Sequence, residues 1–317
     1  MTTALVSGVG AVIGYGIVRS LKLGRPEVRV IGTDIHEHAI GQAWCDAFVR
    51  CPPVSAPEFS SFLLEVCKQH DVNCVFSGFP QEIAALNLLK GPLESQGSRV
   101  VINSAETIAI GIDKWELARA LGCAPFSIRT LLVTAETRFT QLADALGCPY
   151  VVKPRSGSAS KGFAVITDEN EWLGIPRNES MIAQTLIGSP DEEYTAAIHG
   201  HGDGSYVASV VMRRWLGREG NTTRAEVVSD APFRDAFKCI SKMGRPIGPT
   251  NLQFRLDRGN LHLLEINPRI SSSTYMRCLC GYNESLMALD HYVHGIRPKQ
   301  PRVRSIRVIR YAEDRIV

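Results

Sequence analysis

The chain has 317 residues, of which 44% are hydrophobic and 21% charged, and its formal net charge is +3. This length suits about two or three compact subdomains, and so small a charge argues against nucleic acid or a membrane surface as partner. The nine cysteines are scattered without a C-x-x-C pair, which favours reduced thiols in a cytoplasmic protein over a disulfide framework.

The uncharged N-terminal stretch lacks a basic region before its apolar run and is interrupted by glycines, so we expect neither a signal peptide nor a membrane span. A short buried strand leads into the glycine-rich loop Gly8–Gly14, and a second strand ends at Asp34. The dinucleotide fingerprint G-x-G-x-x-G fits only in part, because Ile13 occupies the third glycine position. A nicotinamide-dependent dehydrogenase that uses Gly8, Gly10 and Asp34 is therefore a weak alternative.

The next strand, Val72–Ser77, is followed by a loop and a helix that begins near Glu82. Ligands of open parallel sheets bind at the carboxyl ends of the strands, so this loop is expected to face the same cleft as Gly8. Glu82 is either a substrate contact or an acid matched to the dipole of its helix.

Asp113 and Lys114 begin a helix that is predicted to run to about Leu121. Further on, the predicted strand Tyr150–Pro154 leads into Arg155–Gly162, whose sequence is RSGSASKG. Small residues let backbone N–H groups cradle anionic oxygens, and a strand–loop–strand arrangement suits a lid over a triphosphate. The loop is not a Walker motif, which requires G-x-x-x-x-G-K-[ST].

The predicted strand Met181–Ile187 is followed by an acidic run that ends at Glu193. Two longer predicted strands then carry Arg213, Arg214 and Arg224. One or more of these arginines holds a carboxylate or phosphate, or all three lie on a solvated face; no spacing in the sequence decides between these alternatives.

The stretch from Asn251 to Arg269 predicts a β-hairpin with its turn at Asp257–Asn260. Strict alternation places Gln253 opposite the apolar face of the first strand and puts Glu265 on the face of Leu261 and Leu263 in the second. Gln253, Glu265 and Asn267 could converge across the hairpin, and such hard oxygen ligands suit Mg²⁺ bound with a nucleotide. Arg269 adds a fixed positive charge.

This hairpin resembles the metal-binding strands of the ATP-grasp superfamily, most closely the carbamoyl-phosphate synthetase-like branch with its pattern N-x-Q-F … E-x-N-P-R. The Asp-Lys pair and the glycine-serine loop resemble the same family, so the resemblance covers nearly the whole chain. It implies an α/β ATP-grasp fold: a Rossmann-like domain over residues 1–112, a lid subdomain over 113–187 and a C-terminal subdomain over 188–317.

The resemblance also implies roles for individual residues. The implied metal ligands are Gln253, Glu265 and Asn267, for Mg²⁺ or alternatively Mn²⁺. The implied catalytic residues are Arg269 and Lys161. The residues implied for ATP binding are Lys114, Lys153, Ser156, Gly157, Ser158, Ser160, Lys161, Gly162, Gln184, Leu186, Ile187 and Glu193. Those implied for substrate binding are Gly8, Gly10, Ser77, Glu82, Arg224, Arg269, Ser272 and Ser273.

The reaction implied by the resemblance is ATP-dependent activation of a carboxylate to an acyl phosphate, which an amine then attacks. The expected partners are therefore a small carboxylate and a small amine, and homodimers are common among such ligases. A single unit of this length fits a stand-alone amide or peptide-type ligase better than a two-unit carbamoyl-phosphate synthetase or a biotin-dependent carboxylase. A non-catalytic Mg-ATP sensor on the same fold is the main rival.

Overall fold

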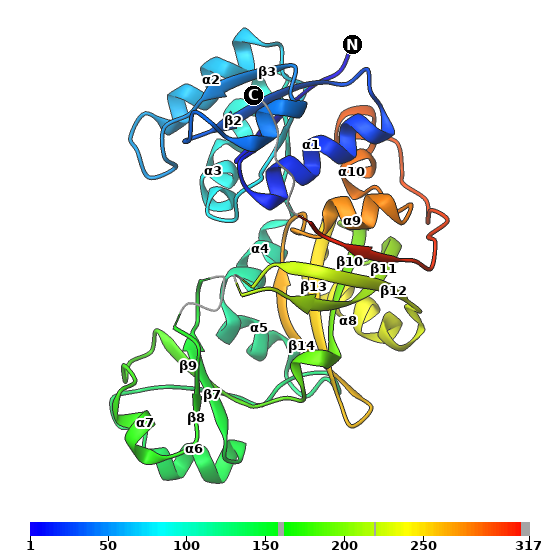
Figure 1. Ribbon diagram of the computed structural model, residues 1–317. Helices are drawn as coiled ribbons and strands as arrows, with labels where there is room; N and C mark the ends of the chain where they lie inside the picture. Colours follow the sequence, from blue (N-terminus) through cyan, green and yellow to red (C-terminus); the bar gives the residue numbers. More distant parts are fainter. Residues whose placement is uncertain (158–161, 219, 312–317) are drawn as a thin grey trace.

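The computed structural model describes residues 1–157, 162–218 and 220–311, and its strands form three sheets (Figure 1). The first sheet is parallel, with the order β3-β2-β1-β4-β5. Its elements are β1 Thr3–Ser7, α1 Val12–Gly24, β2 Arg29–Asp34, the 3₁₀ helix η1 Ile40–Trp44, β3 Ala47–Arg50, α2 Phe59–Gln69, β4 Cys74–Phe76, α3 Glu82–Ser95 and β5 Arg99–Val101.

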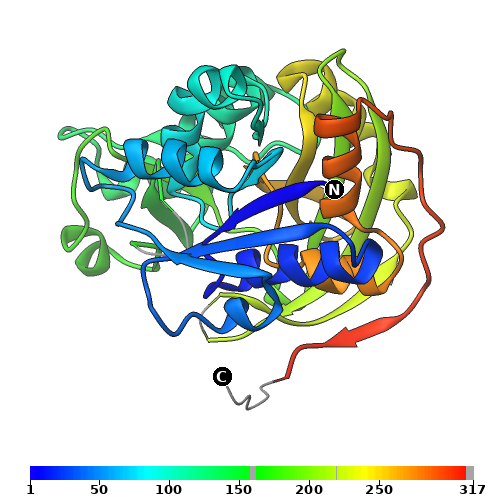
Figure 2. The same cartoon turned by 90° about the horizontal axis from the view of Figure 1, so that it is seen from above.

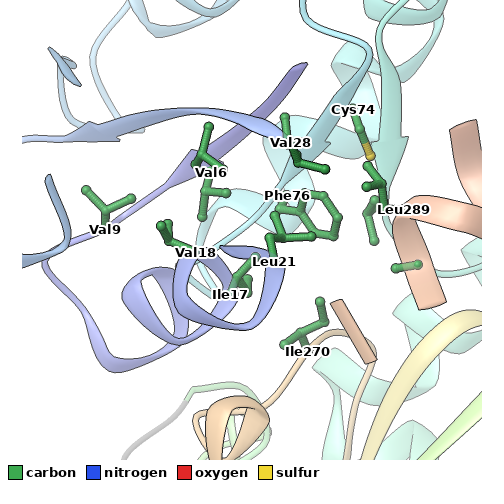
Figure 3. Packing of buried hydrophobic residues seen from close by; sticks show 14 of the residues in the cluster. Val6, Val9, Ile17, Val18, Leu21, Val28, Cys74, Phe76, Ile270 and Leu289 are labelled. Carbon is green, nitrogen blue, oxygen red and sulfur yellow. The ribbon is translucent and has the colours of Figure 1, made fainter. Parts of the chain in front are cut away.

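Apolar side chains cover both faces of this parallel sheet, as its helical crossovers require. On one face Phe76 packs with Ile17 and Leu21 of α1, and Ile270 and Leu289 from the C-terminal part of the chain join the same cluster (Figure 3). The N-terminal domain therefore shares a core with elements more than two hundred residues away in the sequence, and α1 lies against α9 and α10 (Figure 2).

The second sheet is a small antiparallel one with the order β6-β9-β7-β8. The elements of this region are α4 Ala105–Ile112, α5 Lys114–Leu121, β6 Thr130–Leu132, α6 Phe139–Leu146, β7 Tyr150–Pro154, β8 Ala164–Ile166, α7 Glu169–Leu173 and β9 Met181–Thr185. Tyr150 and Trp172 fill its core with edge-to-face packing. The helix α5 instead packs through Leu117 and Leu121 into the core of the third sheet.

The third sheet has the order β14-β13-β10-β11-β12-β15 and is antiparallel throughout. Its elements are η2 Pro190–Glu192, β10 Glu193–His201, β11 Tyr206–Leu216, β12 Thr222–Val228, η3 Ala231–Phe233, α8 Arg234–Gly244, β13 Ile247–Asp257, β14 Asn260–Asn267, α9 Thr274–Leu279, α10 Glu284–His294 and β15 Arg307–Ile309. Phe233 of η3 and Phe237 of α8 stack on each other, and both pack at steep angles against Phe254 of β13.

Most predicted elements are present, although their bounds differ: β4 is shorter than the predicted strand Val72–Ser77, whereas β13 begins at Ile247, before the predicted start of the hairpin. The pattern of residues 135–146 predicts a helix from Ala135, but α6 begins at Phe139, because the hydroxyl of Thr137 accepts a hydrogen bond from the N–H of Thr134 and closes a turn instead. Residues 303–311 read as a closing strand, of which the described residues form only β15. The strands β3 and β6 were not predicted; each has only three or four residues and no clear alternation. No helix in the described ranges combines the length and apolar character needed to cross a membrane.

Candidate functional site

A cavity of about 740 Å³ lies where the three sheets meet. Most of the predicted site residues line it. Those that do are Lys114, Lys153, Ser156, Gly157, Gln184, Leu186, Ile187, Glu193, Gln253, Glu265, Asn267, Arg269 and Ser272. A cavity of this size, walled by apolar side chains with a few convergent charges, is typical of a small-molecule site.

The hairpin of β13 and β14 supplies one wall of the cavity. Gln253 pairs with Glu265, but the next pair is Phe254 with Leu263, so Leu264 is an extra residue in a β-bulge. Leu263 and Ile266 consequently both enter the core, whereas Leu264 and Glu265 both line the cavity. The prediction from strict alternation, that Glu265 lies on the same face as Leu263, is therefore wrong.

Glu265, Asn267 and Arg269 form a chain of hydrogen bonds at this wall. Asn267 Nδ2 donates to Glu265 Oε1 over 2.8 Å, and Arg269 Nη2 donates to Asn267 Oδ1 over 3.1 Å. Burial lowers the pKa of Arg269 to about 10, against the opposing effect of Glu265. Arg269 thus remains a cation at neutral pH beside the predicted metal ligands.

Glu193 lies between two arginines. Arg214 Nη2 is 2.6 Å from Glu193 Oε1, and Arg255 Nη2 is 2.7 Å from Glu193 Oε2. The same Arg214 nitrogen donates to Gln253 Oε1 over 2.6 Å, and Arg255 also donates to the carbonyl oxygen of Ile187 over 2.9 Å. Both carboxylate oxygens of Glu193, and the amide oxygen of Gln253, thus have guanidinium partners.

Sequence reasoning missed Arg255 and left Arg214 undecided, although both line the cavity. The two-residue period that directs Gln253 to the cavity also directs Asn251 and Arg255 there, so the strand pattern contained the signal for them. Arg224 lies over the Trp215 ring at 3.9 Å, and Ser273 is fully buried against the hydroxyl of Thr222, so neither lines the cavity.

Two lysines approach the cavity from the lid side. Lys153 follows the three buried residues of β7, and burial of its ammonium lowers its pKa to about 8 although Glu265 opposes the shift. Lys114 Nζ donates to the carbonyl oxygen of Gly157 over 3.2 Å, which fixes the start of the glycine-serine loop. Gly162 has φ near +72° and packs on Pro154. Ser158, Ser160 and Lys161 lie outside the described residues.

The hinge between the second and third sheets contributes Leu186, Ile187 and the buried Gln184 to the cavity. Gln184 Nε2 donates to the hydroxyl of Thr130 over 2.8 Å. Among the described residues the carbonyl oxygen of Gln184 has no hydrogen-bond donor. The amide therefore offers the cavity a hydrogen-bond acceptor.

The N-terminal domain reaches the cavity through Ile13 and Pro80, whereas Gly8, Gly10, Ser77 and Glu82 are not among the residues that line it. The glycine-rich loop of this domain is held by a hydrogen bond to the carboxylate of Asp34. Gly10 N–H donates to Asp34 Oδ2 over 2.7 Å, and the backbone N–H of His36 donates to Oδ1 over 2.9 Å. Because both oxygens of Asp34 are engaged, the carboxylate is poorly placed for a ribose, which weighs against the dehydrogenase alternative.

Ser77 and Glu82 belong to a buried polar cluster at the carboxyl ends of β1 and β4. Ser7 Oγ donates to Glu82 Oε2, and Ser77 Oγ lies 3.1 Å from the same oxygen. Burial raises the pKa of Glu82 to about 7, with Asp34 adding to the shift and the two hydroxyls opposing it. This carboxyl is thus poised to gain or lose a proton near neutral pH.

Two family models match the sequence. Residues 178–315 match a family described as ATP-grasp in the biosynthetic pathway with the Ter operon, and residues 8–101 match the PylC-like N-terminal domain. Over 203 aligned positions the chain is 23% identical to the carbamoyl phosphate synthase large chain of Kocuria rhizophila; the match covers 58% of this chain and only 18% of that protein.

Solved structures show the fold. N5-carboxyaminoimidazole synthetase from Staphylococcus aureus, complexed with ADP, superposes with a TM-score of 0.72 at 16% identity, covering 95% of this chain and 80% of its own. Biotin carboxylase from Campylobacter jejuni gives 0.74 at 14% identity, with 96% and 73% covered. The biotin carboxylase domain of a Hydrogenobacter thermophilus carboxylase, with MgADP and bicarbonate, gives 0.72 at 13%, with 96% and 72% covered. The chain therefore has the ATP-grasp fold predicted from its motifs.

Proposed function

We propose that this chain, an ATP-dependent ligase-type enzyme of the ATP-grasp superfamily, joins a small carboxylate to a small amine through an acyl phosphate and releases ADP and phosphate. The observation that carries the proposal is the meeting of Lys153, Glu265 and Arg269 with the hinge in one cavity. Cations for phosphates, a carboxylate for a metal and apolar side chains for a base are the groups that one bound nucleotide would need, and this cavity is lined by all three kinds.

The nucleotide end of the cavity suits ATP. Leu186 and Ile187 supply an apolar slot for the base, and the Gln184 oxygen can accept from an exocyclic amino group such as that of adenine. Lys153 and Lys114 stand at the opening of the glycine-serine loop, where the phosphates of a nucleotide bound at the hinge would lie.

The residues present also fit a divalent cation. Glu265 is a carboxylate that lines the cavity, and among the described residues only its Oε1 accepts a hydrogen bond. Few protein ligands suffice for Mg²⁺ bound with a nucleotide, since phosphate oxygens and water complete its shell. When bound, Mg²⁺ supplies charge neutralisation on the phosphates.

The acceptor end provides the means to position a carboxylate. Arg269, Ser271 and Ser272 line the cavity together with Ile13 and Pro80 of the N-terminal domain. A carboxylate held there by Arg269 would be aligned for attack on the γ-phosphate, and the guanidinium would then stabilise the charge that develops on the transferred group. The chain's contribution is thus positioning and electrostatic stabilisation.

The test is ADP release from Mg-ATP with pools of carboxylates, each with and without a pool of amines. Release that requires both partners supports the ligase. ATP binding without release from any pool favours the nucleotide sensor, and a lack of ATP binding overturns the nucleotide site itself. Glu265→Gln keeps the shape of the side chain and removes its charge, so turnover should fall by at least about 10²-fold while the protein stays folded.

A further inference from the structure

The buried Arg214 joins two predicted ligand residues through a single nitrogen. Its Nη2 is 2.6 Å from Glu193 Oε1 and 2.6 Å from Gln253 Oε1, and its side chain lines the cavity while only 6% exposed. A guanidinium can only donate, so the Gln253 atom that faces it must be the amide oxygen. Gln253 is therefore oriented with its one acceptor against a cation.

The backbone register fixes this arrangement. In the antiparallel pairing of β10 with β13, Glu193 is opposite Arg255 and Thr195 is opposite Gln253. On the other side of β10, Tyr194 is opposite Arg213, which brings the next residue along β11, Arg214, beside Glu193. The three strands thus place two arginines around one glutamate, which leaves one net positive charge at the cavity wall.

A metal ion on Gln253 would be repelled by this charge. An ion bound to the amide oxygen would lie within a few ångströms of the guanidinium that already donates to that oxygen, in a site largely shielded from water. Glu265, on the strand next to Gln253, differs in that it carries its own negative charge and has one carboxylate oxygen without a hydrogen-bond donor among the described residues. The two residues are therefore unequal as metal ligands.

We propose that the nucleotide site takes one divalent cation, held by Glu265, and that Arg214 supplies the second positive charge directed at the nucleotide phosphates while keeping Gln253 out of the metal's coordination shell. This inference rests on the proposed use of ATP. It assigns Arg214 as a phosphate-binding residue, a role for which a buried, fixed guanidinium is well suited.

The first test counts and locates the metal. Mn²⁺ held by the chain is counted by equilibrium dialysis, with the same saturating concentration of a non-hydrolysable ATP analogue in both compartments so that the Mn²⁺ bound to free analogue is subtracted. We expect one Mn²⁺ per chain, an affinity within about twofold of wild type for Gln253→Ala, and a loss of at least tenfold for Glu265→Gln. Two ions per chain, or equal losses in the two variants, would overturn the proposal.

The second test measures the affinity of the analogue in the presence of EDTA, where no metal contributes. Arg214→Met should weaken binding by about tenfold or more, because a charge-assisted phosphate contact is lost. The matched control is Arg213→Met, the next residue on β11, which pairs with Glu192 and does not line the cavity; it should bind as wild type does. Equal affinities of the two variants would refute the role of Arg214.

These outcomes separate the inference from the function on which it rests. If the wild-type chain binds no nucleotide in either test, the proposed function fails and the inference fails with it. If the chain binds nucleotide and turns it over but also holds two metal ions, the function stands and the inference alone is overturned. Should Arg214→Met not fold, the comparison of Gln253→Ala with Glu265→Gln still decides which residue holds the metal, and Arg214→Gln takes the place of the methionine variant in the second test.

Discussion

Arg155 at the end of β7 forms an ion pair with Asp113, the N-cap residue of α5, with Nη2 2.6 Å from Oδ2. The backbone N–H of Lys114 also donates to the carbonyl oxygen of Arg155 over 2.9 Å. Since α5 packs on the third sheet and β7 belongs to the second, these contacts join the lid to the rest of the molecule beside the glycine-serine loop. The Asp-Lys pair therefore acts as an anchor as well as a source of charge.

The anchor can be tested with Asp113→Asn. Asparagine caps a helix about as well as aspartate, so the substitution removes mainly the ion pair with the half-buried Arg155. A pair of this kind is worth up to about 1 kcal/mol, and we expect the KM for ATP to rise by about fivefold because the start of the lid loop is less well fixed. The assay is ADP release at varied ATP concentration.

Asp168→Asn is the matched control for this prediction. Asp168 is also an N-cap, of α7 in the same small sheet region, and accepts from the N–H of Glu171 over 3.0 Å. Its substitution should leave the KM for ATP unchanged. If both variants behave alike, the ion pair has no part in fixing the loop.

The sequence contained enough to identify the hairpin, the lid strand with Lys153 and the fold, because their residue patterns are local. It could not reveal the bulge at Leu264, since a bulge alters pairing without requiring a particular residue type at that position. It also could not orient Arg214, because that depends on the register of β10 against β11, which the intervening turn sets. Both features lie in the site and change which side chains line the cavity.

Lys153 should make ATP affinity depend on pH. With its pKa lowered to about 8 by burial, the ammonium is present at pH 7.5 and largely lost at pH 9.5. Bound phosphates favour the charged form, so the wild-type affinity for ATP should fall over this range. Lys153→Met should bind about tenfold more weakly at pH 7.5 and show little change with pH. Isothermal titration calorimetry at the two pH values measures both effects.

The control for Lys153 is Lys238→Met, which removes an exposed ammonium that pairs with Asp235 on α8. It should retain the wild-type pH dependence. A Lys153→Met variant whose affinity falls with pH as steeply as that of the wild type would show that another group is responsible.

The unfolding free energy should fall as pH rises, because the folded chain then loses the stabilisation that comes from protonated Glu82. Its pKa is raised from 4.5 to about 7 in the folded protein, so the folded state keeps a proton that the unfolded state loses. The resulting stabilisation is full below about pH 4.5 and is lost as pH rises to 7. Integrated over this window the effect is about 3 kcal/mol, and Glu82→Gln should abolish it.

Urea denaturation at pH 5 and pH 8 measures this effect. The unfolding free energy of Glu82→Gln, relative to the wild type, should increase between the two values. Glu65→Gln, at an exposed position of the neighbouring helix α2, serves as the control. Parallel curves for wild type and Glu82→Gln would mean that Glu82 is ionised in the folded protein.

A chain of three hydrogen-bonded imidazoles should make the unfolding free energy fall as pH drops, which is the opposite of the effect of Glu82. His199 Nε2 lies 3.1 Å from His291 Nδ1, and His291 Nε2 lies 3.3 Å from His201 Nδ1. Burial lowers the pKa of His199 to about 3, and the other two imidazoles add to the shift. Burial also lowers the pKa of His291 and of His201; at His201 the nearby Arg297 adds to the shift and Asp203 opposes it.

Because the folded chain resists protonation at His199, the unfolded state alone takes up that proton below pH 6.5. Stability is therefore full above 6.5 and falls as pH drops towards 3, with His199 contributing a slope of about 1.4 kcal/mol per pH unit. Unfolding free energies at pH 7, 6 and 5 should fall less steeply for His199→Gln than for the wild type or for His38→Asn, which removes an exposed imidazole. The slope is the deciding quantity, since the substitution can also lower stability at every pH through lost packing; identical slopes would mean that the buried imidazole is protonated in the folded protein.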